Sequence, residues 1–228
     1  MEKYIKLLSS VSHFNKLKPS DLLKIINSGR LKHYRKDKFI YQQGDPGAGM
    51  FVLFSGKVHL CNYNCDGQIH IFSIIEPVIM FNELTVIDGG PNPATAIAVK
   101  DCLTWNISFE PFNQLVMRYP DPAIGLAMMR VLADRTRNLI TLCGDLSFRS
   151  VLSRCAKLIL DLSDQGTKII DRAEFPLADL AARVSTAPES VSRSLSWLDN
   201  RGLISCDRHR ISVQAADDLL DIVIEESS

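Results

Sequence analysis

The spacing of hydrophobic and polar positions divides the chain into three parts. Residues 2–28 carry apolar side chains three and four positions apart, which predicts helices. From about Leu31 onward, short apolar runs such as "GMFVLFSG" and "QIHIFSII" are cut by Gly, Asp and Pro, which predicts short strands joined by turns, with a hairpin at Asp66 and Gly67. Helical spacing returns at Pro111. The pattern therefore predicts an α+β chain with a β-rich first half and a helical second half.

The longest segment with helical spacing begins at Ile124 and ends at Leu146. Its apolar positions follow a rough heptad, formed by Met128, Leu132, Leu139, Leu142 and Leu146. Such a heptad suits a two-stranded coiled coil, although Arg135 interrupts it, so we expect this helix to join two copies of the chain. The alternative is a helix that lies on its own β-rich domain. A further amphipathic helix should run to about Gly166, with the domain junction at residues 146–150.

Residues 174–213 are the most informative part of the sequence. They predict a short helix, a tight turn at residues 185–187 and a second helix from Pro188. Thr186 and Glu189 have the spacing of a capping box, in which a hydroxyl and a carboxylate satisfy the free amides of the first helical turn. Two helices joined by a three-residue turn are typical of the helix-turn-helix, whose second helix enters the major groove of DNA.

Polar side chains occupy the outward face of this second helix. Glu189, Ser192 and Arg193 are spaced i, i+3, i+4, and a carboxylate, a hydroxyl and a guanidinium can each bond to base edges. A solvated ion pair between Glu189 and Arg193 is the alternative. After the helix, "GLISC" and "ISV" predict the strands of a wing, whose tip could contact phosphates. The candidate DNA-binding residues are Thr186, Glu189, Ser190, Ser192, Arg193, Arg208, His209 and Arg210.

The composition narrows the class of protein without changing this interpretation. The 228 residues include 26 basic and 26 acidic residues, so the formal net charge is zero and a DNA-binding surface has to be local. No apolar run approaches the roughly 20 residues of a membrane span. The N-terminus lacks a secretory signal, so we expect a cytoplasmic protein with no membrane partner. The sequence offers no nucleophile–base pair or glycine-rich phosphate loop, and an enzyme is not expected.

Three motifs in order resemble the CRP/FNR family of bacterial transcription regulators. "YQQGDPGAGMFVLFSGKVHL" is similar to the family's β-roll, "FNELTVIDGG" to its ligand cassette, and "DLAARVSTAPESVSRSLSWLDNRGLI" to its helix-turn-helix; the resemblance covers residues 14–219. It implies a cyclic-nucleotide-binding-like β-roll at residues 1–118, a long dimerisation helix at residues 119–147 and a winged helix-turn-helix domain at residues 148–228. It also implies a homodimer, joined through residues 124–146, that binds DNA and contacts RNA polymerase.

The ligand cassette departs from the form that binds cyclic nucleotides. In those relatives F-G-E-L is followed by R-[S/T]-A, whose arginine and hydroxyl hold the cyclic phosphate. Here Asn82 replaces the glycine, while Pro93 and Ala94 stand at the arginine and hydroxyl positions; Thr95 reaches the hydroxyl position only in a shifted register. Because a buried phosphate without a cation is costly, we do not expect cyclic AMP to bind. The cassette residues are Phe81, Asn82, Glu83, Leu84, Pro93, Ala94 and Thr95.

Two shorter motifs place the resemblance on the FNR side of the family. "ESVSR" at residues 189–193 is similar to the E-x-x-S-R form of that side, which implies half-sites like TTGA rather than GTGA. "GPNPATAIA" is similar to the cassette of the nitric-oxide-responsive, DNR-like regulators, which are thought to use haem, and that comparison makes His13 a candidate haem ligand. An iron–sulfur cluster is not expected, because no cysteine precedes Cys61.

The signal itself stays open in the sequence. His59 and His70, with Cys61 and Cys65, are a weaker candidate for a metal site, and the two cysteines alone for a redox switch. A second function is a cyclic-nucleotide-binding signalling module that acts on another protein. Pro93 and the complete helix-turn-helix argue against that second function.

Overall fold

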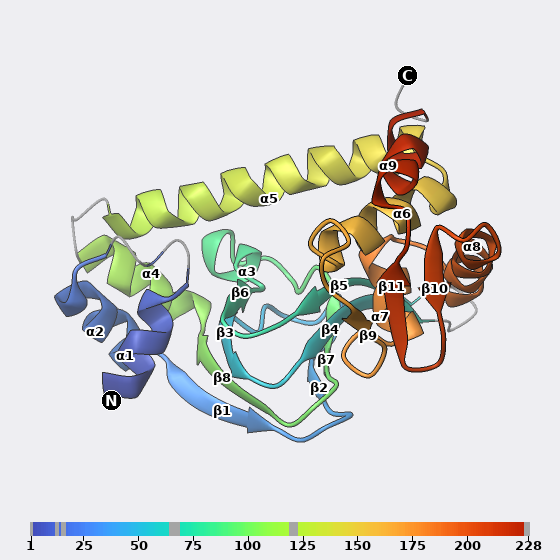
Figure 1. Ribbon diagram of the computed structural model, residues 1–228. Coiled ribbons are helices and arrows are strands. Elements are labelled where there is room, and N and C mark those ends of the chain that lie inside the picture. Colours follow the sequence, from blue (N-terminus) through green and yellow to red (C-terminus); the bar gives the residue numbers. More distant parts are fainter. Residues whose placement is uncertain (1, 12–13, 15–16, 64–68, 119–122, 226–228) are drawn as a thin grey trace. The chain divides into compact units, whose positions relative to one another are not determined.

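The computed structural model describes residues 2–11, 14, 17–63, 69–118 and 123–225 (Figure 1). The chain divides into two compact units, one built mainly from residues up to 136 and the other mainly from residue 137 onward. The helix α5 (Ala123–Phe148) belongs to both. Over the described ranges, we find no helix with the length and apolar character that crossing a membrane requires.

The first unit is a β-roll made of two four-stranded sheets. The strand orders are β1-β8-β3-β6 and β2-β7-β4-β5. The strands are β1 (Arg30–Tyr34), β2 (Phe39–Tyr41), β3 (Met50–Ser55), β4 (Val58–Tyr63), β5 (Ile69–Ile75), β6 (Ile79–Phe81), β7 (Thr95–Ala98) and β8 (Cys102–Ile107). The central strand β3 reads "MFVLFS" and is buried along its first five residues, because neighbouring strands pair with both of its edges and both of its faces are covered.

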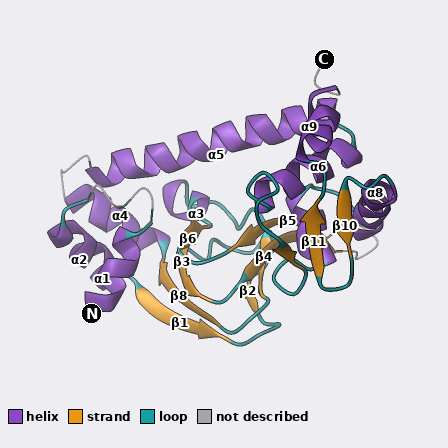
Figure 2. Ribbon diagram, viewed as in Figure 1, coloured by secondary structure: helices purple, strands orange, loops and turns teal. Residues whose placement is uncertain are grey.

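Helices cover one sheet of the roll (Figure 2). They are α1 (Glu2–Ser9), α2 (Pro19–Ser28), α4 (Phe109–Arg118) and the first half of α5, while the short α3 (Leu84–Ile87) follows β6. Trp105 of β8 is 1% exposed and donates its indole N–H to the carbonyl of Ile26 at 3.1 Å. Gly29 lies directly against this indole, where a Cβ would come within 2.3 Å of the ring. The position therefore admits glycine alone, and it fixes how α2 enters β1.

The second unit packs four helices, α6 to α9, with a small sheet. Its elements are α6 (Val151–Leu162), β9 (Ile170–Asp171), α7 (Leu177–Arg183), α8 (Pro188–Asn200), β10 (Ile204–Cys206), β11 (Arg210–Val213) and α9 (Ala216–Glu225). The sheet has the order β10-β11-β9. Apolar side chains at helical spacing on α6, α7 and α8 meet in one core, including Ile159, Leu180, Leu195 and Leu198.

The architecture confirms the predicted fold class: a β-roll, a long helix and a winged helix-turn-helix. The long helix extends slightly beyond the predicted segment, and α6 begins three residues after its end. The helix α3 within the cassette was not predicted. The expected hairpin at Asp66 and Gly67 lies outside the described residues.

Candidate nucleic-acid interface and ligand cassette

The turn between α7 and α8 positions the candidate recognition helix. Val184 follows α7, and Ser185 adopts a left-handed backbone with φ of 52°, which lets the chain reverse within three residues. Ala187, in extended backbone, is the residue before α8, and Pro188 begins the helix, where its missing N–H is not needed. The predicted capping box is wrong: α8 has no side-chain cap, because Thr186 lies in the turn and donates its own N–H to Ala181 at 3.0 Å.

The faces of α8 separate apolar from polar side chains. Its inward stripe is formed by Val191, Ser194, Leu195 and Leu198, all buried. Glu189, Ser192 and Arg193 are exposed on the outward face, and Ser190 is half-buried beside them. Arg193 Nη2 donates to Ser190 Oγ at 3.2 Å, so the guanidinium leans along the helix toward its N-terminal end. This is the end that approaches base edges in helix-turn-helix proteins.

The wing presents three exposed basic side chains. Arg208, His209 and Arg210 lie at the tip of the antiparallel pair β10–β11. Asp207 orders this tip by accepting the backbone N–H groups of His209 (2.7 Å) and Arg210 (2.8 Å). These hydrogen bonds, helped by the Arg210 side chain at 3.4 Å, hold the pKa of Asp207 below its ordinary value. Arg210 therefore forms an ion pair with Asp207, whereas Arg208 is exposed at the tip.

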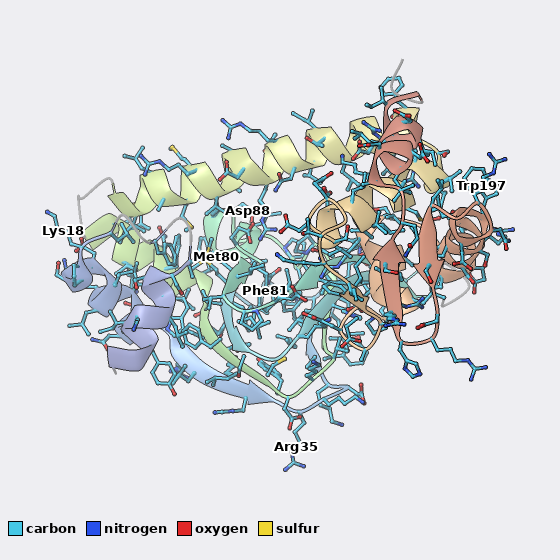
Figure 3. The ribbon with its side chains drawn as sticks, viewed as in Figure 1. Lys18, Arg35, Met80, Phe81, Asp88 and Trp197 are labelled. Carbon is cyan, nitrogen blue, oxygen red and sulfur yellow. The ribbon has the colours of Figure 1, made fainter. Side chains whose placement is uncertain are left out.

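The cassette begins at the end of β6 (Figure 3). Phe81 is 1% exposed and stacks on Phe51 with ring centroids 5.3 Å apart, while Tyr41 lies against both rings. The next residue, Asn82, has a left-handed backbone with φ of 62°, a conformation that asparagine tolerates better than most residues. Leu84 begins α3 and is 44% exposed. The aromatic cluster anchors the start of the cassette in the interior of the roll.

Asn92 fixes the rest of the cassette loop. Its side-chain oxygen accepts from the N–H of Ala48 at 2.9 Å and from Asn82 Nδ2 at 3.0 Å. Its Nδ2 donates to the carbonyls of Gln42 (3.1 Å) and Pro46 (3.2 Å). Sequence reasoning did not single out this residue, and the only local signal is its place between two prolines. The Asn92 amide thus ties the loop to three other segments of the roll, at residues 42–46, 48 and 82.

The predicted phosphate positions hold no cation. Pro93 is exposed, and Ala94 is 4% exposed with its methyl group in the interior. Thr95 is 2% exposed, and its hydroxyl accepts the N–H of Gln43 at 3.0 Å, so it is used within the loop. The local geometry thus matches the sequence interpretation that this stretch is neutral.

A cation does reach the cassette from α5. Arg135 Nε lies 3.1 Å from Glu83 Oε1, and Arg135 Nη2 donates to the Met80 carbonyl at 2.7 Å. Glu83 also acts on Tyr41. Burial raises the pKa of Tyr41 far above its ordinary range, and the negative charge of Glu83 raises that pKa further. Sequence reasoning treated Arg135 as an interruption of a heptad. The two partners are 52 positions apart, so only the packing of α5 on the roll brings them together.

The predicted heptad of α5 is exposed at Leu139 and Leu146 but not at its first residue. The prediction that Met128 faces a partner copy is wrong, because it is 5% exposed and packs in the core of its own roll with Ile124 and Val131. Exposed or half-buried positions instead recur at heptad spacing in another register: Leu126, Met129, Ala133, Thr136, Ile140 and Cys143. The roll takes one face of α5, which leaves this seam open.

The other sensor candidates are only partly described. His13 and Cys65 lie outside the described residues, as does the side chain of His70. Cys61 is fully buried in β4, and burial raises the pKa of its thiol, which disfavours the reactive thiolate. Among the described residues no group of three or more His, Cys, Asp and Glu side chains could hold a metal ion.

Comparison with known proteins identifies relatives of both units. The family described as "Cyclic nucleotide-binding domain" matches residues 31–119, and "Crp-like helix-turn-helix domain" matches residues 153–222. The cyclic AMP receptor protein of Thermus thermophilus is 30% identical over 203 residues, covering 89% of this chain and 92% of the relative. The CRP-like cAMP-activated global transcriptional regulator of Mycobacterium tuberculosis is 23% identical, covering 94% of this chain and 97% of the relative.

Solved structures share the architecture. The crystal structure of the Thermus thermophilus catabolite activator protein is 27% identical with a TM-score of 0.54, and the match covers 94% of this chain and 99% of that one. The c-di-GMP responsive global regulator CLP of Xanthomonas campestris has a TM-score of 0.70 at 20% identity, covering 86% of this chain and 99% of that one.

An enzyme also appears among the relatives, over a small part of its length. Lysophospholipase nte1 of Aspergillus oryzae is 26% identical over 142 residues, which are 62% of this chain but 9% of the enzyme. The relatives that match along nearly their whole length are transcription regulators. The expectation that this chain is not an enzyme agrees with them.

Proposed function

Because the chain belongs to the CRP/FNR family of transcription regulators, we propose that it is a homodimeric, sequence-specific DNA-binding regulator whose α8 reads TTGA-like half-sites. The observation that carries the proposal is the exposed face of α8, where Glu189, Ser192 and Arg193 follow a helix-turn-helix turn beside a basic wing. We assign residues 1–118 to a sensor domain, residues 119–147 to dimerisation and residues 148–228 to DNA binding. As in the family, the dimer would contact RNA polymerase in the cytoplasm.

The roles of individual residues follow from their positions. Glu189 and Arg193 read base edges, with Ser190 orienting the Arg193 guanidinium. Ser192 adds a hydroxyl to the same face, and Thr186 lies in the turn where the DNA backbone passes. The wing residues Arg208, His209 and Arg210 contact phosphates, which position the protein without reading sequence.

Selection of binding sites from random DNA tests the half-site. We expect recovered sequences with TTGA and its inverted complement, whereas GTGA half-sites would contradict the assignment. Arg193→Ala should cost about 1–3 kcal/mol and relax preference at one base pair. Lys36→Ala is the matched control, because it removes an exposed cation from the other unit, and it should leave the recovered sequence unchanged.

The dimer is proposed to form through α5. Leu126, Met129 and Ile140 are 45%, 67% and 67% exposed, which is unusual for apolar side chains aligned on one face of a helix. The heptad spacing of the seam suits a second copy of the same helix, so that a two-fold axis would place two α8 helices on a palindromic site. The interface lies within the predicted residues 124–146.

We propose that the cassette does not bind cyclic AMP, although the names of several relatives include that ligand. Pro93 and Ala94 supply no cation or hydroxyl, and the Thr95 hydroxyl, which accepts the N–H of Gln43, brings no positive charge. Arg135, the cation nearest to the cassette in the contacts described, is held by Glu83 and Met80. An anionic ligand would have to disrupt that pair.

Calorimetric titration with cyclic AMP tests whether the cassette binds this nucleotide. Wild-type protein should give no saturable heat, and the double variant Pro93→Arg, Ala94→Ser should gain binding, because it restores a guanidinium and a hydroxyl to the start of β7. Saturable binding of cyclic AMP by the wild type would contradict the proposal. If such binding came without binding to DNA, it would favour the alternative of a cyclic-nucleotide-binding signalling module acting on another protein.

The effector is proposed to be a neutral or haem-bound signal such as nitric oxide, with a redox response as the weaker candidate. The haem hypothesis rests on His13, which lies outside the described residues, so no step is derived through the group. An absorbance spectrum after titration with haem should show a Soret band that His13→Ala loses. A wild-type spectrum equal to that of free haem would remove this candidate.

A further inference from the structure

A basic and aromatic ridge runs along one flank of α8. Arg193, Trp197 and Arg201 are spaced four residues apart, so they lie one above another on the same side of the helix. Trp197, marked in Figure 3, is 37% exposed, although a large aromatic side chain on a helix usually turns into the core. The inward stripe of α8 is complete without it. The ridge is therefore free to contact something outside the protein.

Arg201 is held against the indole. Its Cζ lies 4.2 Å from the centroid of the Trp197 ring, in a cation–π contact. A guanidinium stacked in this way keeps its N–H donors at its edge, in the plane of the group, where they can meet two oxygens of one anion. Trp197 thus fixes the direction of the donors before any ligand arrives.

The opposite flank of α8 is already used. The Asp199 carboxylate accepts the backbone N–H of Cys206 at 2.9 Å, which ties that flank to the wing. The two flanks therefore differ in charge, with Asp199 on the wing side and Arg193 and Arg201 on the ridge. An anion would approach the ridge rather than the other side.

We infer that Trp197 and Arg201 form a phosphate-binding pair at the edge of the DNA site. Building on the proposed function, Arg193 stands at the N-terminal end of α8, which enters the major groove. Eight residues separate it from Arg201, a rise of about 12 Å along the helix. The major groove is itself about 12 Å wide, so the far end of α8 emerges where the sugar–phosphate backbone borders the groove. Arg201 binds a phosphate there, and Trp197 positions it.

The competing explanation is a helix-stabilising role. Arg201 directly follows the last residue of α8, and a cation at this end interacts favourably with the helix dipole. In that case Arg201→Gln would lower thermal stability and leave the salt dependence of DNA binding unchanged. A phosphate contact predicts the reverse, because each neutralised phosphate releases counterions and adds to the salt slope.

Fluorescence anisotropy distinguishes the phosphate contact from the helix-stabilising role. The binding of the 228-residue protein to a TTGA palindrome and to a scrambled duplex is measured over a series of salt concentrations. For each copy of Arg201→Gln, the slope of log K against log salt should fall in magnitude by about 0.9, and equally on both duplexes. Arg201→Lys should retain the slope. Trp197→Ala should weaken binding while Trp197→Phe, which keeps a ring beneath the guanidinium, should bind more tightly than Trp197→Ala.

The controls separate failure of this inference from failure of the proposed function. Lys36→Gln, a charge removed from the other unit, should leave the slope unchanged, and circular dichroism should show that each variant is folded. If the wild type binds with a salt-dependent affinity and Arg201→Gln keeps the same slope on both duplexes, the inference is wrong while the proposed function stands. If the wild type binds neither duplex, both are wrong.

Discussion

Asn92 shows how a single residue can keep the shape of a ligand cassette that has no phosphate cation. It is 2% exposed, and both ends of its amide are bonded to main-chain or side-chain groups of neighbouring loops. Asn82 stands at the glycine position of the family pattern and takes the left-handed backbone that the turn requires. The side-chain amides of Asn82 and Asn92 thus hold the loop by hydrogen bonds.

Replacement of Asn92 by Ala should destabilise the first unit. The change leaves the Ala48 N–H and two carbonyls without their partner in a partly buried loop, and we expect a loss of about 1–3 kcal/mol in the free energy of unfolding. Urea denaturation, followed by Trp105 fluorescence, measures it. Asn138→Ala, at an exposed position of α5, is the control and should change stability little. Equal stability of the two variants would contradict the role of Asn92.

Asp145, near the end of α5, forms ion pairs with residues of the second unit, to which it belongs. Its carboxylate lies 2.9 Å from Arg149 Nε and 2.8 Å from Lys157 Nζ, and Arg149 also donates to the carbonyl of Val223 on α9. Burial alone would raise the pKa of Asp145, but the hydrogen bonds and charges of Lys157 and Arg149 outweigh it and hold the pKa below its ordinary value of 3.8. One carboxylate thus couples three segments.

The lowered pKa predicts a pH dependence. Because the folded-state pKa lies below the unfolded value, the stabilisation is present above that value and is lost as the pH falls through the folded pKa. Asp145→Asn should therefore cost about 1–3 kcal/mol at neutral pH, and the difference from the wild type should shrink below about pH 4. Thermal unfolding at both pH values tests this. Asp218→Asn replaces an exposed acid on α9 and should show no such difference. A difference in stability between Asp145→Asn and the wild type that stays constant across the pH range would contradict the prediction.

The helix α5 packs on the roll with one face and exposes apolar side chains on another. Its first half closes the core of the roll with Ile124, Met128 and Val131, and it sends Arg135 to the cassette. The remaining face carries the seam of exposed apolar positions. A signal that moved Arg135 away from Glu83 would therefore act on the helix that is proposed to hold the dimer together.

A charge placed in the seam should break the dimer. Ile140→Glu would set two carboxylates against each other across a two-fold axis, and we expect monomers in analytical ultracentrifugation where the wild type sediments as a dimer. Asn138→Glu is the matched control, because two residues along a helix turn the side chain to nearly the opposite face. If both variants remained dimeric, the seam would not be the interface.

Sequence patterns predicted those features that are encoded locally. Short apolar runs cut by Gly, Asp and Pro predicted the strands of the roll, and the three-residue turn before Pro188 predicted the helix-turn-helix. The Arg135–Glu83 pair and the bonds of Asn92 could not be predicted, because their partners are more than 40 positions apart and meet only through packing. The heptad prediction failed at Met128 for a related reason: several apolar positions on α5 fit a heptad, and packing on the roll decides which of them are covered.

In the whole molecule, the two units differ in what their side chains offer to a ligand. The roll carries a cassette with no cation at its phosphate positions, and the second unit has an exposed face on α8 with basic side chains on the wing and at the far end of the helix. The formal net charge of zero leaves room for this division, because the cations proposed to contact DNA lie in one unit. Sequence-specific binding by a dimer is the claim on which the other proposals depend.

Native mass spectrometry tests that claim most directly. The protein is mixed with a TTGA palindrome, with a duplex in which one half-site is scrambled, and with a fully scrambled duplex. The account predicts two chains per palindrome, at an affinity at least about 1,000-fold above that for the fully scrambled duplex, and a large loss when one half-site is removed. Equal affinity for the three duplexes, or a single chain bound to the palindrome, would contradict it.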